Sequence, residues 1–138
     1  AQLDLPEVAG RKEASSIITA QVTRHDLDYQ LTSLRFGGQS LSLSGLVAKP
    51  NEDVRIRVFA TDVAIALTKP QGISIRNVLP AVVTAIRVDV ASPFADVLVA
   101  VDGQSLRVRM TRASLDEMNL RESQHVFALL KTASLASD

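Results

Sequence analysis

The residues of this 138-residue sequence that are best suited to chemistry are small hydrogen-bond donors in its second half. They fall in three short stretches: Ser74, Arg76 and Asn77; Thr111 and Ser114; Lys131 and Thr132. A tetrahedral oxyanion offers only hydrogen-bond acceptors, so its site needs hydroxyls, backbone N–H groups and one or two cations, and no carboxylates. These residue types therefore fit an oxyanion-binding set.

The same residues also have ordinary structural interpretations. Ser114 can cap a helix, and Asn77 can stabilise a turn. Arg76 and Lys131 can simply lie in solvent, as most exposed cations do. Residue type and spacing by themselves leave both interpretations open.

No other constellation predicts a catalytic or metal site. His25 and His125 lie near expected strand ends, without a serine–histidine–carboxylate set or the i, i+4 spacing of a metal-binding helix. Asp26 and Asp28 fit a polar turn better than a metal pair. The chain has no cysteine and no GxxxxGK[ST] loop, so a thiol nucleophile and P-loop ATP hydrolysis are excluded. We expect no catalytic residue, no metal ligand and no cofactor.

Composition indicates a folded protein without a strong charge bias. Hydrophobic residues make up 46% of the chain, and 15 basic residues balance 15 acidic ones. Neither half of the chain has a net positive charge that would attract a polyanion, and only 4% of residues are aromatic. Both features disfavour nucleic acid as a ligand. The longest apolar stretches, such as "VLPAVVTAI", are too short to cross a bilayer, so we expect no membrane insertion.

Alternation of period two dominates the sequence and predicts short antiparallel strands. Val54, Ile56 and Val58 form one such series, and Leu106, Val108 and Met110 form another. The pairs Gly37-Gly38 and Asp102-Gly103 stand between alternating runs and supply the positive φ that tight hairpin turns require. Two β-hairpins are predicted there.

The two hairpins repeat each other, which indicates an internal duplication. "GGQSLSLS" at 37–44 aligns with "DGQSLRVR" at 102–109, and a final strand is expected after each, in "RIRVFATDVAIAL" and "HVFALLKTASL". The second copy is longer by a stretch in which Ser114 and Glu117 form a capping-box pattern, which predicts a short helix. The expected fold is all-β: two tandem small OB-like antiparallel β-barrels, with one short helix in the second repeat.

The predicted organisation has three parts. Residues 1–14 are expected to be a linker from an absent upstream domain, 15–70 a first half-barrel and 71–138 a second one. Pro70, Gly72 and Pro80 bracket the crossover between the halves as breakers. The two half-barrels are expected to act together as one domain.

Three stretches of the sequence resemble a known family. "GISIRNVLPAVV", "LRVRMTRASLDEMNL" and "HVFALLKTASL" are similar to the paired Mop (TOBE-type) domain at the C-terminus of molybdate-importer ATPases of the ModC type. The resemblance covers about residues 3–136 and implies a di-Mop fold. It also implies that Ser74, Arg76, Asn77, Thr111, Ser114, Lys131 and Thr132 bind the oxyanion, commonly at a subunit interface. The first half departs from the pattern, since Thr61 and Asp62 stand where Lys131 and Thr132 are expected.

The resemblance implies a function as well. It implies a cytoplasmic regulatory domain that binds molybdate or tungstate, is not itself an enzyme, and inhibits import through a homodimer. The implied partners are an upstream ATPase domain and a membrane permease, with the domain peripheral at the inner face of the cell membrane. Two alternatives remain: a dimerisation or spacer module without ligand binding, and an OB-type oligonucleotide-binding module.

Overall fold

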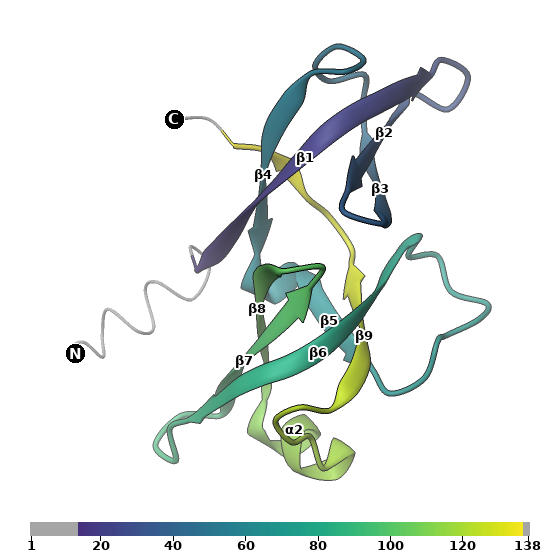
Figure 1. The fold of residues 1–138 in the computed structure, drawn as a ribbon. Coiled ribbons are helices and arrows are strands. Elements are labelled where there is room, and N and C mark those ends of the chain that lie inside the picture. Colours follow the sequence, from purple (N-terminus) through teal and green to yellow (C-terminus); the bar gives the residue numbers. More distant parts are fainter. Residues whose placement is uncertain (1–13, 137–138) are drawn as a thin grey trace.

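The computed structural model describes residues 14–136, which are almost entirely β-structure (Figure 1). Except for Ala14, the predicted linker lies outside the described residues. In chain order the elements are β1 (Ser15–Asp26), β2 (Leu31–Phe36), β3 (Gln39–Ser44), β4 (Asp53–Phe59), η1 (Ala60–Asp62), β5 (Val63–Ala66), β6 (Asn77–Val88), β7 (Phe94–Val101), β8 (Gln104–Thr111), α2 (Arg112–Met118), β9 (His125–Leu130) and β10 (Ser134–Leu135).

The strands form two five-stranded antiparallel sheets that lie end to end (Figure 1). The first has the order β10-β4-β1-β2-β3 and the second the order β5-β9-β6-β7-β8. Each half of the chain therefore gives one strand to the other, because β5 pairs with β9 and β10 pairs with β4. The predicted all-β fold of two small antiparallel units with one short helix is confirmed.

Both predicted hairpins are present, and each has a two-residue turn. β2 and β3 are joined through Gly37 and Gly38, and β7 and β8 through Asp102 and Gly103. Gly37, Asp102 and Gly103 all have positive φ, as a tight hairpin turn requires. The hairpins fix which faces of the strands point inward.

One continuous apolar core runs through both sheets. The alternating strands bury Ile18, Leu34 and Ile56 in the first sheet and Val97 and Leu106 in the second, each at most 1% exposed. Burial of a side chain of this size contributes about 1.5–3 kcal/mol. The outward positions carry serine, threonine and arginine, which leaves the outer faces free for polar contacts.

Side chains bond to backbone across the junction between the sheets. The Asn77 side chain accepts from Ser42 N at 2.8 Å and donates to Ser42 O at 2.9 Å. Ser16 Oγ accepts from Arg107 N at 2.8 Å. Ser42 and Arg107 occupy equivalent places in the two hairpins. The backbone N–H at this place is therefore bound in both halves, by Asn77 in one case and by Ser16 in the other. The two hairpin turns also meet, as Gly38 N donates to Asp102 Oδ2 at 2.8 Å.

The predicted helix is present, but its capping differs from the prediction. Thr111, and not Ser114, is the N-cap: its side chain accepts a hydrogen bond from Ser114 N. The capping box assigned to Ser114 was wrong because the helix starts directly at the end of β8, where Thr111 still has extended backbone angles. Leu115 of the helix and Leu120 just after it are buried against the core.

Three expectations about the strands need correction. The stretch "RIRVFATDVAIAL" is not one strand, because η1 separates β4 from β5 and directs them into different sheets. The last strand is likewise interrupted, since β9 ends at Leu130. Pro80 does not break β6; it pairs with Phe127 of β9, and β7 joins β6 only from Val82 onward, so the other side of Pro80 has no partner strand. A strand tolerates proline at such an unpaired side.

Candidate functional site

Two of the three predicted ligand stretches meet in one surface pocket between the sheets. The pocket has a volume of about 290 Å³ and is open to solvent. Ser74, Arg76, Asn77, Lys131 and Thr132 line it. The other lining residues are Leu31, Ser42, Ser44, Ile75 and Leu130, so none of the residues described by the structure brings a carboxylate to the pocket.

Strand register explains why these stretches meet. β6 and β9 are antiparallel, and Asn77, the first residue of β6, lies opposite Leu130, the last residue of β9. The residues before Asn77 must therefore lie beside the residues after Leu130. Gly72, with φ of 71°, turns the crossover before this point. Lys131 and Thr132 thus lie in the connection after β9, not in a strand as expected.

The Asn77 side chain mainly bonds across the junction between the sheets, and only part of its hydrogen-bonding capacity is left for the pocket. It is 9% exposed, and its side-chain amide is engaged by the backbone of Ser42 on the open edge of β3. One amide N–H remains for a ligand, since a carboxamide nitrogen carries two hydrogens. Asn77 therefore holds the two sides of the pocket at a fixed spacing.

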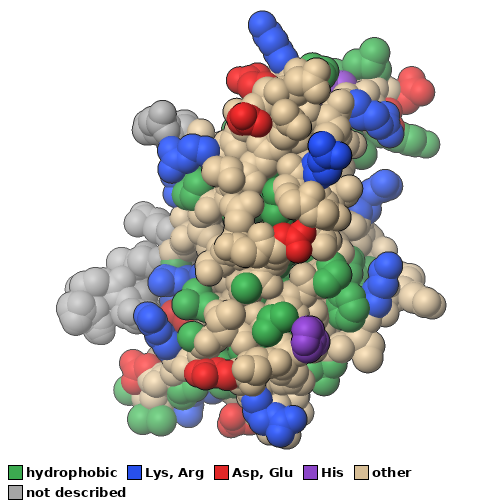
Figure 2. All heavy atoms as spheres, viewed as in Figure 1, with side chains coloured by type: hydrophobic (Ala, Val, Ile, Leu, Met, Phe, Trp, Pro, Cys, Tyr) green, Lys and Arg blue, Asp and Glu red, His purple; other side chains and the backbone are tan. Residues whose placement is uncertain are grey.

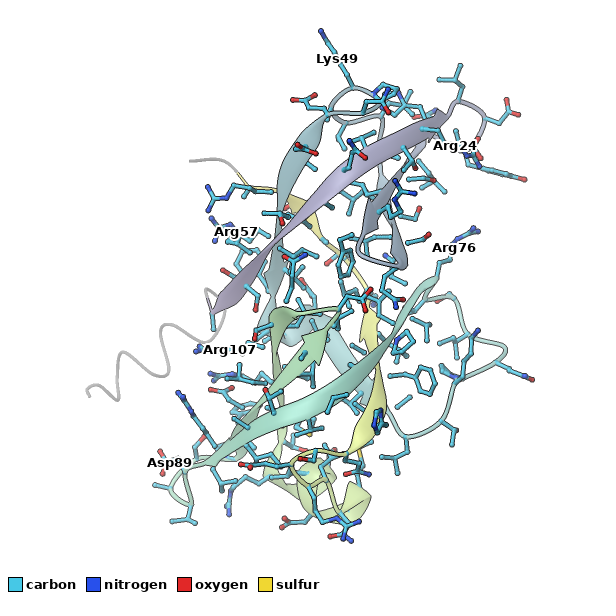
Figure 3. All side chains as sticks on the ribbon, viewed as in Figure 1. Arg24, Lys49, Arg57, Arg76, Asp89 and Arg107 are labelled. Carbon is cyan, nitrogen blue, oxygen red and sulfur yellow. The ribbon has the colours of Figure 1, made fainter. Side chains whose placement is uncertain are left out.

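The pocket has a positive charge from Arg76 and Lys131. Both are exposed, and within residues 14–136 neither side chain has a hydrogen bond or ion pair. Figure 3 shows Arg76 at the start of β6, pointing away from the body of the molecule. Four residues with hydroxyl groups, Ser42, Ser44, Ser74 and Thr132, line the same pocket. The arrangement offers donors to an anion and leaves one side uncovered.

Thr111 and Ser114 are not brought to this pocket. They lie at the start of α2, which is at the end of the second sheet remote from the first sheet (Figure 1). Thr111 Oγ1 donates to Ser114 Oγ at 3.0 Å. A single copy of the chain therefore cannot bring the whole predicted set to one oxyanion.

Ser42 and Ser44 are lining residues that the sequence analysis missed. They belong to the run Ser40-Leu41-Ser42-Leu43-Ser44, in which serine points outward at every second position of an edge strand. The run was interpreted only as half of a hairpin. Small hydroxyls repeated on the outer face of an edge strand were the signal that could have revealed them.

The first half does not repeat the pocket. Ser16 takes the place of Asn77 at the junction, and Asp62 stands where Thr132 is in the second half. Asp62 O accepts from Lys131 N at 2.9 Å, so these equivalent segments lie side by side. Asp96 and Arg109 of the second sheet are joined in a 3.0 Å ion pair. Asp62 puts a carboxylate in the first half at the place of Thr132, and a carboxylate would repel an oxyanion.

Several other features are relevant to function. The structure holds no group of three or more His, Cys, Asp or Glu side chains suited to a metal ion among its described residues. In the same part of the chain, no helix has the length and apolar character needed to cross a membrane. Figure 2 shows basic and acidic side chains interspersed over the viewed face, without a continuous basic stripe on that face.

Comparison with known proteins finds similar sequences and a similar solved structure. Residues 73–136 match the TOBE domain family. The chain is 36% identical over 129 residues to the molybdenum import ATP-binding protein ModC of Rhizobium meliloti, covering 91% of this chain and 35% of that protein. It is 35% identical over 132 residues to ModC of Hahella chejuensis, covering 96% and 37%. The chain thus spans about a third of the length of these relatives.

A solved structure shares the fold. It is the cytoplasmic molybdate-binding protein ModG with molybdate bound, which matches with a TM-score of 0.72 at 18% identity and covers 91% of this chain and 97% of that one. At this identity the match concerns the fold. Residues 73–136 are therefore similar to the TOBE domain family, and nearly the whole chain is similar to about one third of the ModC import proteins.

Proposed function

We propose that this chain is a cytoplasmic oxyanion-binding regulatory domain of a molybdate importer, with molybdate or tungstate as its ligand. The observation that carries the proposal is the pocket at the start of β6. There, Ser74, Arg76 and Asn77 meet Lys131 and Thr132 from the far end of the chain, and within residues 14–136 no carboxylate lines the pocket. The names of the relatives and of the structural neighbour support molybdate as the ligand.

The pocket supplies what a tetrahedral dianion requires. Arg76 and Lys131 provide two positive charges, and hydroxyls of Ser74 and Thr132 provide further donors. The free N–H of Asn77 can add one more. No metal, cofactor or catalytic group is needed for this role, and we assign the chain no reaction of its own.

A second copy of the chain completes the site in this proposal. Thr111 and Ser114 lie too far along the second sheet to reach the pocket of their own chain, whereas Arg76 points outward. In a homodimer, the α2 end of one chain would supply its hydroxyl pair to the pocket of the other. The half-barrels at 15–70 and 71–138 act as one unit in this dimer, which the exchange of β5 and β10 supports.

A shared site explains regulation. A ligand changes a conformational equilibrium only if it binds one state better than another. An oxyanion held between two copies favours the arrangement in which they are together. We propose that this arrangement keeps the associated ATPase domains from closing, so that import through the membrane permease stops when cytoplasmic oxyanion is plentiful. The domain then lies peripherally at the inner face of the membrane.

Isothermal titration calorimetry with molybdate, tungstate and sulfate tests the proposal. Arg76→Ala and Lys131→Ala each remove a charge-assisted contact, so each is expected to weaken molybdate binding about 10- to 100-fold. Lys69→Ala is the matched control, because Lys69 is exposed in the same crossover and lies outside the pocket. A chain that dimerises but gives no saturable heat with any of the anions would refute ligand binding and favour the spacer alternative.

A further inference from the structure

A second hollow lies next to the pocket, on the outer face of the first sheet. It has a volume of about 490 Å³, compared with about 290 Å³ for the pocket. Its lining comes from β1, β2, β3 and the start of β6. The two hollows share Leu31, Ser42, Arg76 and Asn77, so they are continuous. Nothing in the proposed function uses the larger one.

Strand register arranges the lining in rows. Arg24 lies opposite Ser33, Ser33 lies opposite Ser42, and the Asn77 side chain binds the backbone of Ser42 beside Arg76. Adjacent strands are about 4.8 Å apart, so the serine floor between Arg24 and Ser42 spans about 10 Å. Arg35 lies opposite Ser40 in the next row on the same face.

A β-bulge supplies the arginine at the far end of the row. The pairing of β1 with β2 shifts between Val22 and Arg24, so that Thr23 is the additional residue. Bulges of this kind redirect a side chain, and here Arg24 points to the outer face beside Ser33. Figure 3 shows Arg24 and Arg76 on the same side of the molecule.

The charges in this hollow are unbalanced. Arg24, Arg35 and Arg76 line it, and Asp26 is the one carboxylate that the described part of the chain brings to it. No hydrogen bond or ion pair engages any of the three guanidinium groups within residues 14–136. Hydroxyls of Ser33, Ser40 and Ser42 add donors to the floor. The hollow is therefore positive and rich in donors.

The duplication provides an internal comparison. In the second sheet a bulge occurs at the equivalent place, between Val83 and Ala85, and Ala85 lies opposite Leu98. The place of Arg35 is taken by Ala100, which lies opposite Ser105 as Arg35 lies opposite Ser40. Alanine and leucine thus stand at the places of Arg24, Ser33 and Arg35, whereas Ser105 and Arg107 stand at the places of Ser40 and Ser42. The sheet geometry does not require the arginines.

We propose that this hollow binds a linked oxoanion, such as pyrophosphate, in which two tetrahedral groups are joined. Guanidinium groups pair with such groups bidentately, and three of them on different elements suit more than one tetrahedral centre. Among the described residues no aromatic side chain lines the hollow, so a nucleobase finds no ring there to stack on. The ligand class is therefore an inorganic or small polyanion without a large organic part.

Titration calorimetry with pyrophosphate and orthophosphate, in buffer containing a chelator and no divalent cation, tests this site. Pyrophosphate is expected to bind one per chain, at least tenfold more tightly than orthophosphate, because only the linked anion reaches cations at both ends of the floor. Arg24→Ala with Arg35→Ala is expected to weaken pyrophosphate binding at least tenfold. Arg87→Ala with Arg121→Ala, two exposed arginines of the other half, is the matched control and should change it less than twofold.

The two proposed sites can fail separately. Lys131 does not line the larger hollow, so Lys131→Ala should leave pyrophosphate binding unchanged while weakening molybdate binding. The Arg24/Arg35 double variant should show the reverse, with an unchanged melting temperature. Absence of saturable pyrophosphate binding, an equal effect of the control variant, or equal affinity for orthophosphate would each overturn the proposal. Binding of a hexaglutamate peptide without binding of pyrophosphate would overturn it in favour of an acidic protein partner.

Discussion

Replacing Asn77 by alanine tests whether this side chain supports the junction or binds the ligand. Its amide makes two hydrogen bonds, at 2.8 and 2.9 Å, to the backbone of Ser42. Each such bond contributes about 0.5–1.5 kcal/mol. Ser42 is only partly buried, so water can replace part of what is lost. We expect Asn77→Ala to lower the free energy of unfolding by about 1–2 kcal/mol.

Urea denaturation followed by circular dichroism measures this change. For a chain of this size the melting temperature should fall by roughly 3–5 °C per kcal/mol. Gln71→Ala is the matched control: Gln71 is an exposed amide in the same crossover, and its loss should change stability by less than about 0.5 kcal/mol. Molybdate affinity, measured on folded protein, should fall less than tenfold, because Arg76 and Lys131 remain.

The opposite pattern would refute this reasoning. If Asn77→Ala leaves stability within about 0.5 kcal/mol of the parent and weakens molybdate binding as much as Arg76→Ala, then Asn77 is a ligand and its bonds to Ser42 contribute little. Asn77→Asp separates the roles further. The carboxylate still accepts from Ser42 N but cannot donate to Ser42 O, and its charge should abolish oxyanion binding.

Three further substitutions test the elements around the site. Gly37→Ala should lower the free energy of unfolding by about 2–4 kcal/mol, because φ of 56° strains a residue with a Cβ and because the new Cβ would lie 2.6 Å from Asp102 Oδ2. In an Asp102→Gly background the loss should be at least about 1 kcal/mol smaller, and additive effects of the two substitutions in a double-mutant cycle would contradict that contact. Asp96→Ala leaves the 5%-exposed Arg109 side chain without its carboxylate and should cost about 2–4 kcal/mol in unfolding free energy, partly recovered by adding Arg109→Leu; no recovery would show that the pair is not the cause. Thr111→Ala should cost about 1 kcal/mol through loss of the N-cap of α2, whereas Thr111→Ser should be neutral in thermal melts, and equal losses for both would refute the capping role.

The sequence predicted the local elements well because their signals are local. The turns at Gly37-Gly38 and Asp102-Gly103 require positive φ, and the alternation around them defines the buried face. The exchange of β5 and β10 between the sheets could not be predicted in this way. Period-two alternation shows that a segment is a strand but not which strand it pairs with. Both exchanged strands are also short, at four and two residues.

The candidate site shows the same limit. The residue types of Ser74, Arg76 and Lys131 were compatible with an oxyanion site, but only the register of Asn77 against Leu130 brings them together. The contribution of Ser42 comes from the other half of the chain and depends on the junction between the sheets. Long-range pairing is decided by packing of the whole core, which no short stretch of sequence encodes by itself.

The exchanged strands also determine how the protein can come apart. If the connection between β5 and β6 were cut, each piece would keep a strand that belongs in the other piece's sheet. Neither piece could then complete its sheet alone. In the intact chain both halves should therefore unfold in a single cooperative transition. A half-length precursor of this duplicated chain would have needed two copies to complete each sheet. The present molecule thus holds, within one polypeptide, a strand exchange of the kind that two separate chains make in a dimer.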